Sequence, residues 1–459
     1  MEQTREKLGS RIGFIFLSAG CAIGCGNVWK FPWMAGKYGG GGFVLVYLIC
    51  LVLLGLPVMT MEFTMGRAAQ TSPVRMFQKL QKPKQKWGAY GPLALLGNVA
   101  LMSFYTVVTG WIIYYFGMFI SGNNDKLIVV KNAAGEITNN PFVNMITNAK
   151  LNVIFLAITV VVGFGILCFG LQKGLERVTK YMMAVLLVLM IGLAVYSSTL
   201  SGANEGYKFY LLPDFAKITP EVIVGAMNQA FFTLSLGIGS MAIFGSYIGK
   251  ERSLMGESVS IILLDTAVAI TAGMIMFPVC TTYGLELDAG PSLLFNTMST
   301  VFNKMGVAGR WMGTLFFLFM VFAAFSTVLA VFENILAMVR DLTGLNRPLG
   351  CLVCAAGIFI LGLTTALGYS VIKFQPFADG SAFLDFWDFI VSTNLLPLGS
   401  LAITIFCTYK FGWGWENFKA EANQGKGIKV KDWMRPVFYI VPVIIIVLYV
   451  YGLITFPWK

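Results

Sequence analysis

The chain alternates between long apolar runs and short polar segments. Most runs have about 20 residues or more, the length that an α-helix needs to cross the roughly 30 Å of hydrocarbon in a bilayer. We therefore predict an all-α chain with eleven membrane-spanning helices. They lie near residues 10–36, 42–66, 88–120, 151–171, 175–199, 219–247, 256–284, 309–340, 349–370, 383–410 and 434–456.

Composition agrees with a polytopic membrane protein. Hydrophobic residues make up 57% of the chain and charged residues 12%, against about a quarter charged in soluble domains. The charged N-terminal segment and the missing small-residue cleavage site do not fit a signal peptide, so we expect the first run to remain as a span. No low-complexity linker divides the sequence, and residues 1–459 are treated as a single transmembrane domain.

Lysine and arginine are distributed unevenly between alternate polar segments. If the N-terminus is cytoplasmic, the inner segments hold 22 of these residues and the outer segments 10, with Lys30 inside the membrane. Positive charge accumulates on cytoplasmic loops, so we predict a plasma-membrane protein with an internal N-terminus and, after eleven spans, an external C-terminus. The net charge of +11 therefore indicates topology rather than a nucleic-acid partner.

The chain has eight cysteines and no histidine. The cysteines lie in or beside apolar runs and read as small hydrophobic residues rather than as disulfides or a metal cluster. Without histidine, Ser/His and Cys/His catalysis are excluded, and we do not expect an enzyme.

Two of the predicted spans contain glycine-rich breaks. The stretch Gly20–Pro32 combines glycines with Asn27 and Lys30, and residues 233–239 interrupt the sixth span. A glycine packing face is the alternative, but packing does not explain an amide and a lysine there. Broken helices in corresponding positions of two halves point to a midplane site between inverted repeats, here 10–199 and 219–410, followed by an eleventh span at 434–456.

A break in a span exposes backbone groups that can bind ions. Free amides with a positive helix end suit a carboxylate, whereas free carbonyls suit a small cation. In the first span we predict an anion contact around Cys25 and Gly26 and a Na⁺ site at nearby carbonyls. Hydroxyls of the sixth and eighth spans supply further oxygens, although back-bonding to their own helix is the alternative for each.

Four motifs together resemble the neurotransmitter:sodium symporter family, and in particular its eleven-span bacterial amino-acid transporters. They are Gly20–Pro32, Phe231–Gly239, Met61–Arg67 and Gly174–Arg177. The resemblance covers essentially the whole chain. It implies the leucine-transporter fold, a 5+5 inverted repeat with broken first and sixth helices plus an eleventh span, and alternating access by rocking of spans one, two, six and seven.

The resemblance also implies two sodium sites. The first would use Ala22, Asn27, Thr233, Asp265 and the substrate carboxylate, and the second Gly20, Ile23, Ala323, Ser326 and Thr327. Relatives usually have asparagine where this chain has Asp265. A fixed negative charge there can replace the chloride that animal relatives need, so we predict chloride independence.

The resemblance constrains the substrate as well. Monoamine-transporting relatives have aspartate where this chain has Gly24, which favours an amino acid whose own carboxylate meets the first ion and the Tyr105 hydroxyl. The pocket is otherwise apolar, which favours a neutral hydrophobic side chain. The implied substrate-binding residues are Ala22, Gly24, Cys25, Gly26, Leu101, Tyr105, Val108, Phe232, Thr233, Ser235, Ile238, Val328 and Val331.

Two charged pairs match the gates of the family. Lys30 and Asp388 would close the outer side and Arg5 and Asp341 the inner side. The family usually has arginine in place of Lys30, and because lysine lacks bidentate geometry we expect a weaker or water-mediated outer pair. Ala184 replaces a proline that helps the fifth span of relatives to unwind, which puts that route of ion release in doubt.

We therefore predict a Na⁺-coupled importer of neutral hydrophobic L-amino acids, with two Na⁺ bound. A proton-coupled carrier using Glu62, Asp265 or Glu333, or an amino-acid receptor that does not transport, are the alternatives. The expected partners are the amino acid, sodium ions and the bilayer, with no nucleic acid, and the expected state is a monomer or weak dimer.

Overall fold

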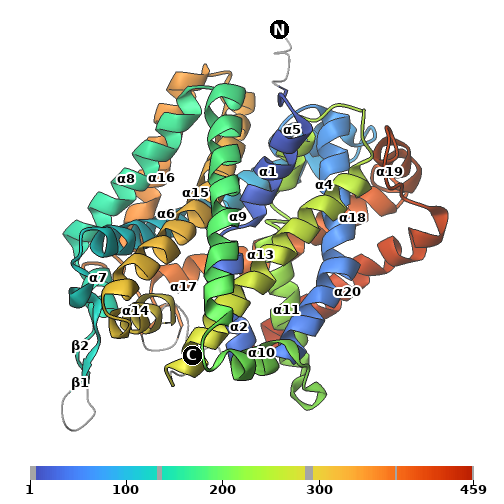
Figure 1. The fold of residues 1–459 in the computed structure, drawn as a ribbon. Coiled ribbons are helices and arrows are strands. Elements are labelled where there is room, and N and C mark those ends of the chain that lie inside the picture. Colours follow the sequence, from blue (N-terminus) through green and yellow to red (C-terminus); the bar gives the residue numbers. More distant parts are fainter. Residues whose placement is uncertain (1–6, 132–136, 285–292, 378–379, 457–459) are drawn as a thin grey trace.

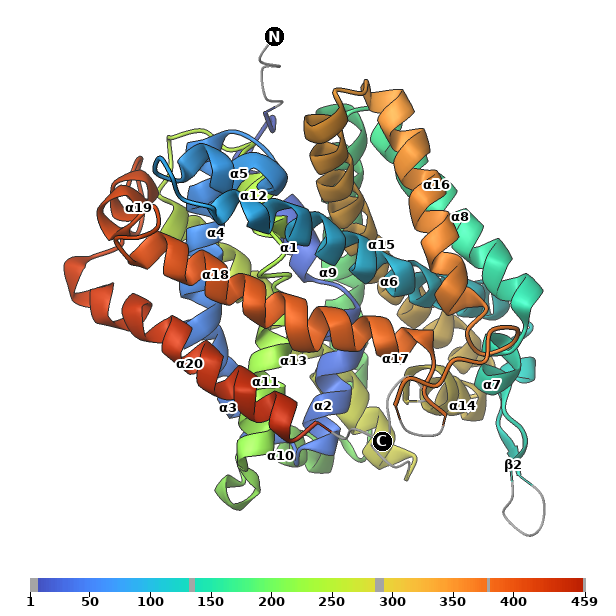
Figure 2. The same cartoon turned by 180° about the vertical axis from the view of Figure 1, so that it is seen from behind.

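Long helices cross the molecule between two faces that carry short elements (Figures 1 and 2). The computed structural model describes residues 7–131, 137–284, 293–377 and 380–456. Within these ranges each of the eleven predicted spans corresponds to one helix or to consecutive helical segments. In chain order they are α1 (Arg11–Ala22) with η1 (Gly26–Lys30) and α2 (Phe31–Lys37); α3 (Gly41–Cys50) with η2 (Leu51–Gly55) and α4 (Leu56–Ala69); α6 (Tyr90–Ile120); α8 (Ala149–Cys168); η5 (Leu171–Glu176) with α9 (Arg177–Ser198); α11 (Pro220–Thr233) with α12 (Ser240–Gly245); α13 (Leu254–Thr282); α15 (Val307–Thr343); α16 (Arg347–Ala366); α17 (Phe383–Asp388) with η8 (Phe389–Leu395) and α18 (Leu396–Thr408); and α20 (Arg435–Ile454).

Both predicted helix breaks are present. The described residues include nine helices long and apolar enough to span a membrane, and a tenth span if the pair Arg11–Ala22 and Gly26–Lys37, bent by 50°, is counted as one. The remaining expected span consists of α11 and α12, which are separated by residues 234–239 and are individually too short to cross.

Short elements cover the two faces. The face near the start of α1 carries α5 (Pro73–Leu80), η3 (Trp87–Ala89), α19 (Trp415–Ala422) and η9 (Asp432–Met434) (Figure 1). On the opposite face, where α20 ends, lie η4 (Asn124–Leu127), β1 (Val130–Lys131), β2 (Ile137–Asn139), α7 (Pro141–Ile146), α10 (Ala203–Leu211), η6 (Phe215–Lys217), η7 (Leu293–Thr297) and α14 (Met298–Lys304). The two strands pair antiparallel, with Val130 opposite Asn139. An odd number of crossings explains why the described chain begins and ends on opposite faces.

Burial separates an inner layer of helices from an outer one. In the most apolar windows of α6 and α15, 78% of residues are buried within the protein, against 22% in α20. Outer helices expose large aliphatic side chains, among them Val161, Val188, Leu352 and Ile454, each at least 67% exposed. Surfaces this apolar are stable against lipid and not against water, which places α8, α9, α16 and α20 at the bilayer.

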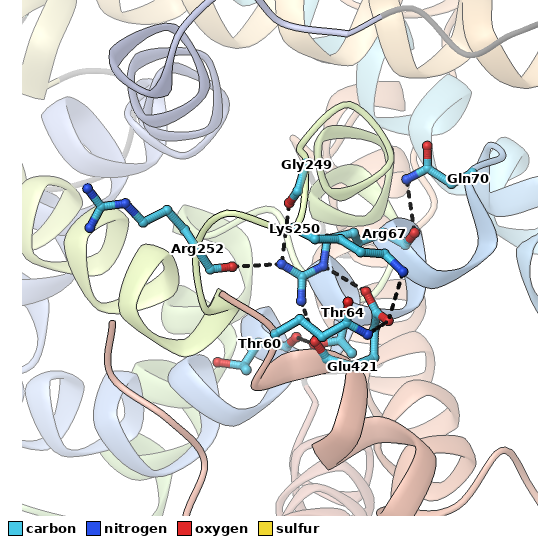
Figure 3. A network of polar contacts seen from close by, with 9 residues as sticks. Thr60, Thr64, Arg67, Gln70, Gly249, Lys250, Arg252 and Glu421 are labelled. Atoms are coloured by element: carbon cyan, nitrogen blue, oxygen red, sulfur yellow. Dashed lines mark hydrogen bonds and ion pairs between the residues drawn. The ribbon is translucent and has the colours of Figure 1, made fainter. Parts of the chain in front are cut away.

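A buried arginine ties together three polar connections on the face that carries α5 and α19 (Figure 3). Arg67, at the end of α4, is fully buried and pairs through Nε with Glu421 of α19 at 2.8 Å. Its Nη1 donates to the carbonyls of Arg252 at 2.7 Å and Gly249 at 3.4 Å, in the α12–α13 connection. The rigid fork of the guanidinium allows one side chain to serve all three segments.

Helices α4 and α12 pack so closely that a methyl group has no room between them. A Cβ on Gly66 would lie 1.8 Å from the Ala242 carbonyl oxygen, which belongs to the backbone and cannot rotate away. We expect Gly66→Ala to destabilise the protein by about 1–3 kcal/mol, measured as a lower unfolding temperature of the detergent-solubilised protein. Gly165→Ala in α8 is the control, because nothing lies within 4 Å of that position. Unfolding of Gly66→Ala at the wild-type temperature would contradict the packing.

Candidate functional site

The first break lies at the centre of the molecule, and side chains of other spans satisfy its backbone. Ile23, at the end of α1, is extended, with φ −73° and ψ 97°. The freed amide of Cys25 donates to the Tyr105 hydroxyl of α6 at 2.8 Å. Gln229 of α11 donates to the carbonyl of Gly26 at 2.7 Å. The break is therefore an ordered structure held by the third and sixth spans.

One side of the break carries a buried carboxylate. Asn27 Nδ2 donates to Asp265 Oδ1 at 2.8 Å and to the Asp265 carbonyl at 3.1 Å. Thr233 donates to both Asp265 carboxylate oxygens, at 3.3 and 3.4 Å. Ala22 is the last residue of α1 and is buried. Asn27, Thr233 and Asp265 thus come together, and the buried Tyr47 hydroxyl also approaches the carboxylate. The side chains of Asn27, Thr233 and Tyr47 are all uncharged.

The other side of the break carries a cluster of hydroxyl and carbonyl oxygens. Thr327 Oγ1 lies 3.1 Å from the carbonyl of Gly20 and 3.4 Å from that of Ile23. Ser326 Oγ lies 3.3 Å from the Ile23 carbonyl and 2.9 Å from the Ala323 carbonyl. All five residues expected at the second ion therefore meet. The back-bond to Ala323 is present, but both hydroxyls also reach across to α1, which back-bonding alone does not explain.

A side chain at Gly24 would be crowded by two hydroxyl groups. A Cβ there would lie 2.4 Å from Thr327 Oγ1 and 2.4 Å from the Tyr105 hydroxyl, and a Cβ on Gly26 would lie 3.1 Å from the ring of Phe232. An aspartate at position 24 has no space in this arrangement. The other expected pocket residues, all buried, are Leu101, Val108, Ile238, Val328 and Val331.

The second break is held by residues that the sequence analysis did not assign to it. The carboxylate of Glu62 accepts from the amides of Gly237 at 2.6 Å and Met241 at 3.1 Å. Asn98 donates to the Ile238 carbonyl at 2.8 Å. A carboxylate on the amides that begin α12 complements the positive end of that helix.

Further polar contacts complete the second break. The Tyr90 hydroxyl donates to the carbonyl of Gly237. Ser235, with φ 51°, donates to the carbonyl of Cys21 at 3.2 Å and so joins the two breaks. Gln229, Asn98 and Tyr90 were missed as site residues. The signal available for Asn98 and Gln229 was an amide side chain inside an otherwise apolar span.

The outer charged pair is in direct contact. Lys30 Nζ lies 3.1 Å from Asp388 Oδ1 and 3.4 Å from Ser392 Oγ, and Ser392 donates to the same carboxylate at 2.6 Å. The ammonium also lies 4.1 Å from the centre of the Phe232 ring. We expected a weaker or water-mediated pair. The direct contact does not fit a water-mediated one, and the strength of the pair stays a prediction.

On the face that carries α5, Asp341 accepts from the Ser72 amide at 2.8 Å and from the Thr71 hydroxyl at 3.4 Å. Arg5, its expected partner, lies outside the described residues. The structure therefore describes only one member of the predicted inner pair.

The start of α1 is held by the fifth span. Glu176 accepts from the Gly9 amide at 2.8 Å and the Ser10 hydroxyl at 3.0 Å, and Lys180 lies 2.7 Å from the same carboxylate. Further along, α9 continues without interruption through Ala184. The helix is thus intact where relatives have the proline.

Glu333, one candidate for a proton carrier, is bound by a tyrosine and an arginine. It accepts from the Tyr247 hydroxyl at 3.0 Å and pairs with Arg347 at 2.5 Å. The Glu333 carboxylate therefore already has a positively charged partner within the protein.

The chain is similar to sodium-dependent transporters over nearly its whole length. The sodium:neurotransmitter symporter family matches residues 5–124 and 142–459. The chain is 34% identical to the sodium-dependent transporter YhdH of Bacillus subtilis (strain 168) over 99% of this chain and 100% of that protein. It is 24% identical to the sodium-dependent serotonin transporter of Drosophila melanogaster over 99% of this chain and 77% of that protein.

A solved structure resembles the whole molecule. The crystal structure of MhsT in complex with L-phenylalanine matches with a TM-score of 0.86 and 35% identity, over 97% of this chain and 99% of that one. This confirms the all-α leucine-transporter fold with its broken first and sixth helices. The family match extends over nearly the whole sequence, and the first and sixth spans are both broken. The chain therefore belongs to the sodium:neurotransmitter symporter family and is a sodium-dependent multi-pass membrane transporter.

Proposed function

We propose that the protein is a Na⁺-coupled importer of neutral hydrophobic L-amino acids that works by alternating access without chloride. The observation that carries this proposal is the arrangement at the first break. Two oxygen clusters flank one unwound segment, and they bring together residues of the first, sixth, seventh and eighth spans. Cations bound at both clusters would couple ion occupancy to the relative positions of these spans.

The first Na⁺ is proposed at Asn27, Thr233 and Asp265, with Ala22 and the substrate carboxylate. A buried carboxylate whose contacting side chains are neutral is costly in the membrane, and a small cation compensates it. Oxygen ligands from amide, hydroxyl and carboxylate suit a hard ion. The fixed charge of Asp265 supports chloride independence, because no additional anion is required to balance the cation.

The second Na⁺ is proposed at Gly20, Ile23, Ala323, Ser326 and Thr327. The hydroxyls of α15 are directed at the carbonyls that end α1. A cation between them would replace these hydrogen bonds by ligation and hold α1 against α15. Losing the ion would leave weaker contacts, which is the change that inward release needs.

The substrate is proposed to be an α-amino acid with an apolar side chain. Its carboxylate would meet the first Na⁺, the Tyr105 hydroxyl and the amides near Cys25 and Gly26. The apolar pocket residues offer no partner for a charged side chain. The crowding at Gly24 gives further support, since no side-chain counterion fits there for an amine that lacks its own carboxylate. L-Phenylalanine in the MhsT structure belongs to the same substrate class.

The bonding partners of the three candidate proton carriers favour sodium coupling over proton coupling. Glu62 holds two backbone amides and Glu333 holds an arginine, so both have structural partners. Asp265 is the remaining candidate, and it lies within the proposed ion cluster.

The inward direction rests on the proposed orientation, with the α5 face cytoplasmic. Lys30 and Asp388 would then close the outer side, with Tyr105 and Phe232 as a lid below them. Glu176, which holds the start of α1, and Asp341 would act on the inner side. The two helix breaks support inverted repeats at 10–199 and 219–410.

Uptake into proteoliposomes tests the function itself. With an imposed inward Na⁺ gradient we expect accumulation of a neutral aliphatic or aromatic amino acid, because ion flow supplies the work, and accumulation should stop when Na⁺ is replaced by K⁺. Competition by all twenty amino acids defines the substrate class. Uptake that follows a pH gradient without Na⁺ would indicate proton coupling, and Na⁺-dependent binding without accumulation would indicate a receptor.

Single substitutions test the ion sites. Asn27→Ala and Thr327→Ala each remove one proposed oxygen ligand, so the Na⁺ concentration for half-maximal uptake should rise about tenfold, equivalent to about 1.4 kcal/mol. Thr314→Ala is the matched control on α15, since its hydroxyl donates only to its own helix, at the Arg310 carbonyl. Unchanged Na⁺ dependence in both site variants would overturn the assignments.

Anion replacement tests the role of Asp265. We expect the wild-type uptake rate to be the same in chloride and in gluconate. The uptake rate of Asp265→Asn should be at least about tenfold lower in gluconate than in chloride, because the negative charge that balances the cation is gone. Asp388→Asn removes a carboxylate at the outer pair and should not create a chloride requirement. A chloride requirement in the wild type would refute the proposal.

A further inference from the structure

A groove lies between the start of α6 and the middle of α18, and none of the proposed ion or substrate ligands lines it. These helices lie side by side on the face of the molecule seen in Figure 2. The groove has a volume of ≈ 440 Å³. Its walls are aromatic and aliphatic, with one ammonium group. The lining residues are Lys86, Trp87, Ala89, Tyr90, Leu93 and Ala402.

The groove begins in the bilayer and ends at its polar boundary. Leu93, in the wall of the groove, is 48% exposed, and Leu96, one turn further along α6, is 51% exposed. We therefore expect the end of the groove near Leu93 to face lipid tails. Trp87 lies at the upper end, and tryptophan is favoured at membrane interfaces. The shape of the groove thus suits a molecule with an apolar tail and a polar head.

The polar end is strongly basic. Lys82, Lys84, Lys86 and Lys410 are all exposed there or in the connected loops. No aspartate or glutamate occurs from residue 63 to 124 or from 389 to 415. Of the next carboxylates after α18, Glu416 and Asp432 pair with Arg435 and Lys419. In the part of the chain that the structure describes, these four lysines form no salt bridge with a carboxylate.

The basic loop is also held in place. Lys82 Nζ donates to the Lys410 carbonyl at 2.7 Å. Gln85 and Trp87 both donate to the carbonyl of Phe411, at 2.7 and 3.0 Å. These bonds join the segment before α6 to the segment after α18, so the groove and its charges are preorganised.

We propose that this groove binds an anionic phospholipid of the leaflet on the α5 face, with one acyl chain along Leu93 and Ala402 and the phosphate at Lys86, Lys84 and Lys82. Charge complementarity selects an anionic over a zwitterionic headgroup. The apolar wall distinguishes a lipid from a free phosphate ion. None of the lining residues is a proposed ion or substrate ligand, although the Tyr90 hydroxyl also donates to the Gly237 carbonyl at the second break.

The test uses the full-length protein in detergent with added phosphatidylglycerol or phosphatidylcholine, and native mass spectrometry counts the lipids retained. Wild type should retain phosphatidylglycerol preferentially. The variant Lys82→Gln/Lys84→Gln/Lys86→Gln should retain it at least about tenfold more weakly, since each lysine near an anionic headgroup contributes roughly fivefold. The matched control is Lys426→Gln/Lys429→Gln/Lys431→Gln, which removes three exposed lysines outside the groove.

A second variant separates groove binding from diffuse attraction. Ala402→Phe fills the apolar wall without changing charge and should also lose the lipid, and Lys86→Gln alone serves if the triple variant does not fold. Equal retention of both lipids by the wild type would overturn the proposal. So would equal losses in the groove and control triples, full retention by Ala402→Phe, or displacement of the lipid by soluble glycerol phosphate.

Discussion

Backbone hydrogen bonding inside the membrane is the constraint on which this structure depends. A continuous helix satisfies its own amides and carbonyls, but α1 and α11 both stop halfway, where water is not available to replace the lost partners. Each freed group must then find a side chain, an ion or a ligand. The Cys25 amide donates a hydrogen bond to the Tyr105 hydroxyl, and the Gly26 carbonyl accepts one from Gln229. The remaining carbonyls face hydroxyls, and that exchangeable arrangement is what an ion site requires.

The two breaks are satisfied in different ways. The first lies among neutral oxygens and one carboxylate, groups that a bound cation can draw together. The second is held by Glu62 and Asn98. Ser235 links the two breaks through the Cys21 carbonyl. A cation bound at either proposed cluster would therefore act on both discontinuous helices, and this link would couple ion occupancy to movement.

Buried charges in this protein are distinguished by their partners. Arg67 and Glu421 form a pair supplemented by backbone carbonyls (Figure 3). Glu333 pairs with Arg347. Glu62 is compensated by backbone amides at a helix start. Asp265 differs from these because the side chains that approach it, Asn27, Thr233 and Tyr47, are uncharged. Burial alone would not have separated a structural carboxylate from one proposed to bind an ion.

The sequence by itself determined the eleven spans and the two breaks, because the length of an apolar run and the position of helix-breaking glycines are local properties of the chain. It also determined the family, through four motifs. The sequence also predicted ion sites around Asn27 and Thr327; the structure brings oxygen-bearing residues together at both places, and ion binding there stays a prediction. Tertiary structure alone decided what satisfies the broken backbone. Tyr90, Asn98 and Gln229 act on segments more than a hundred residues away, and no local pattern assigns such partners. The direct Lys30–Asp388 contact and the crowding at Gly24 were likewise decided only by packing, because both depend on how far apart whole helices stand.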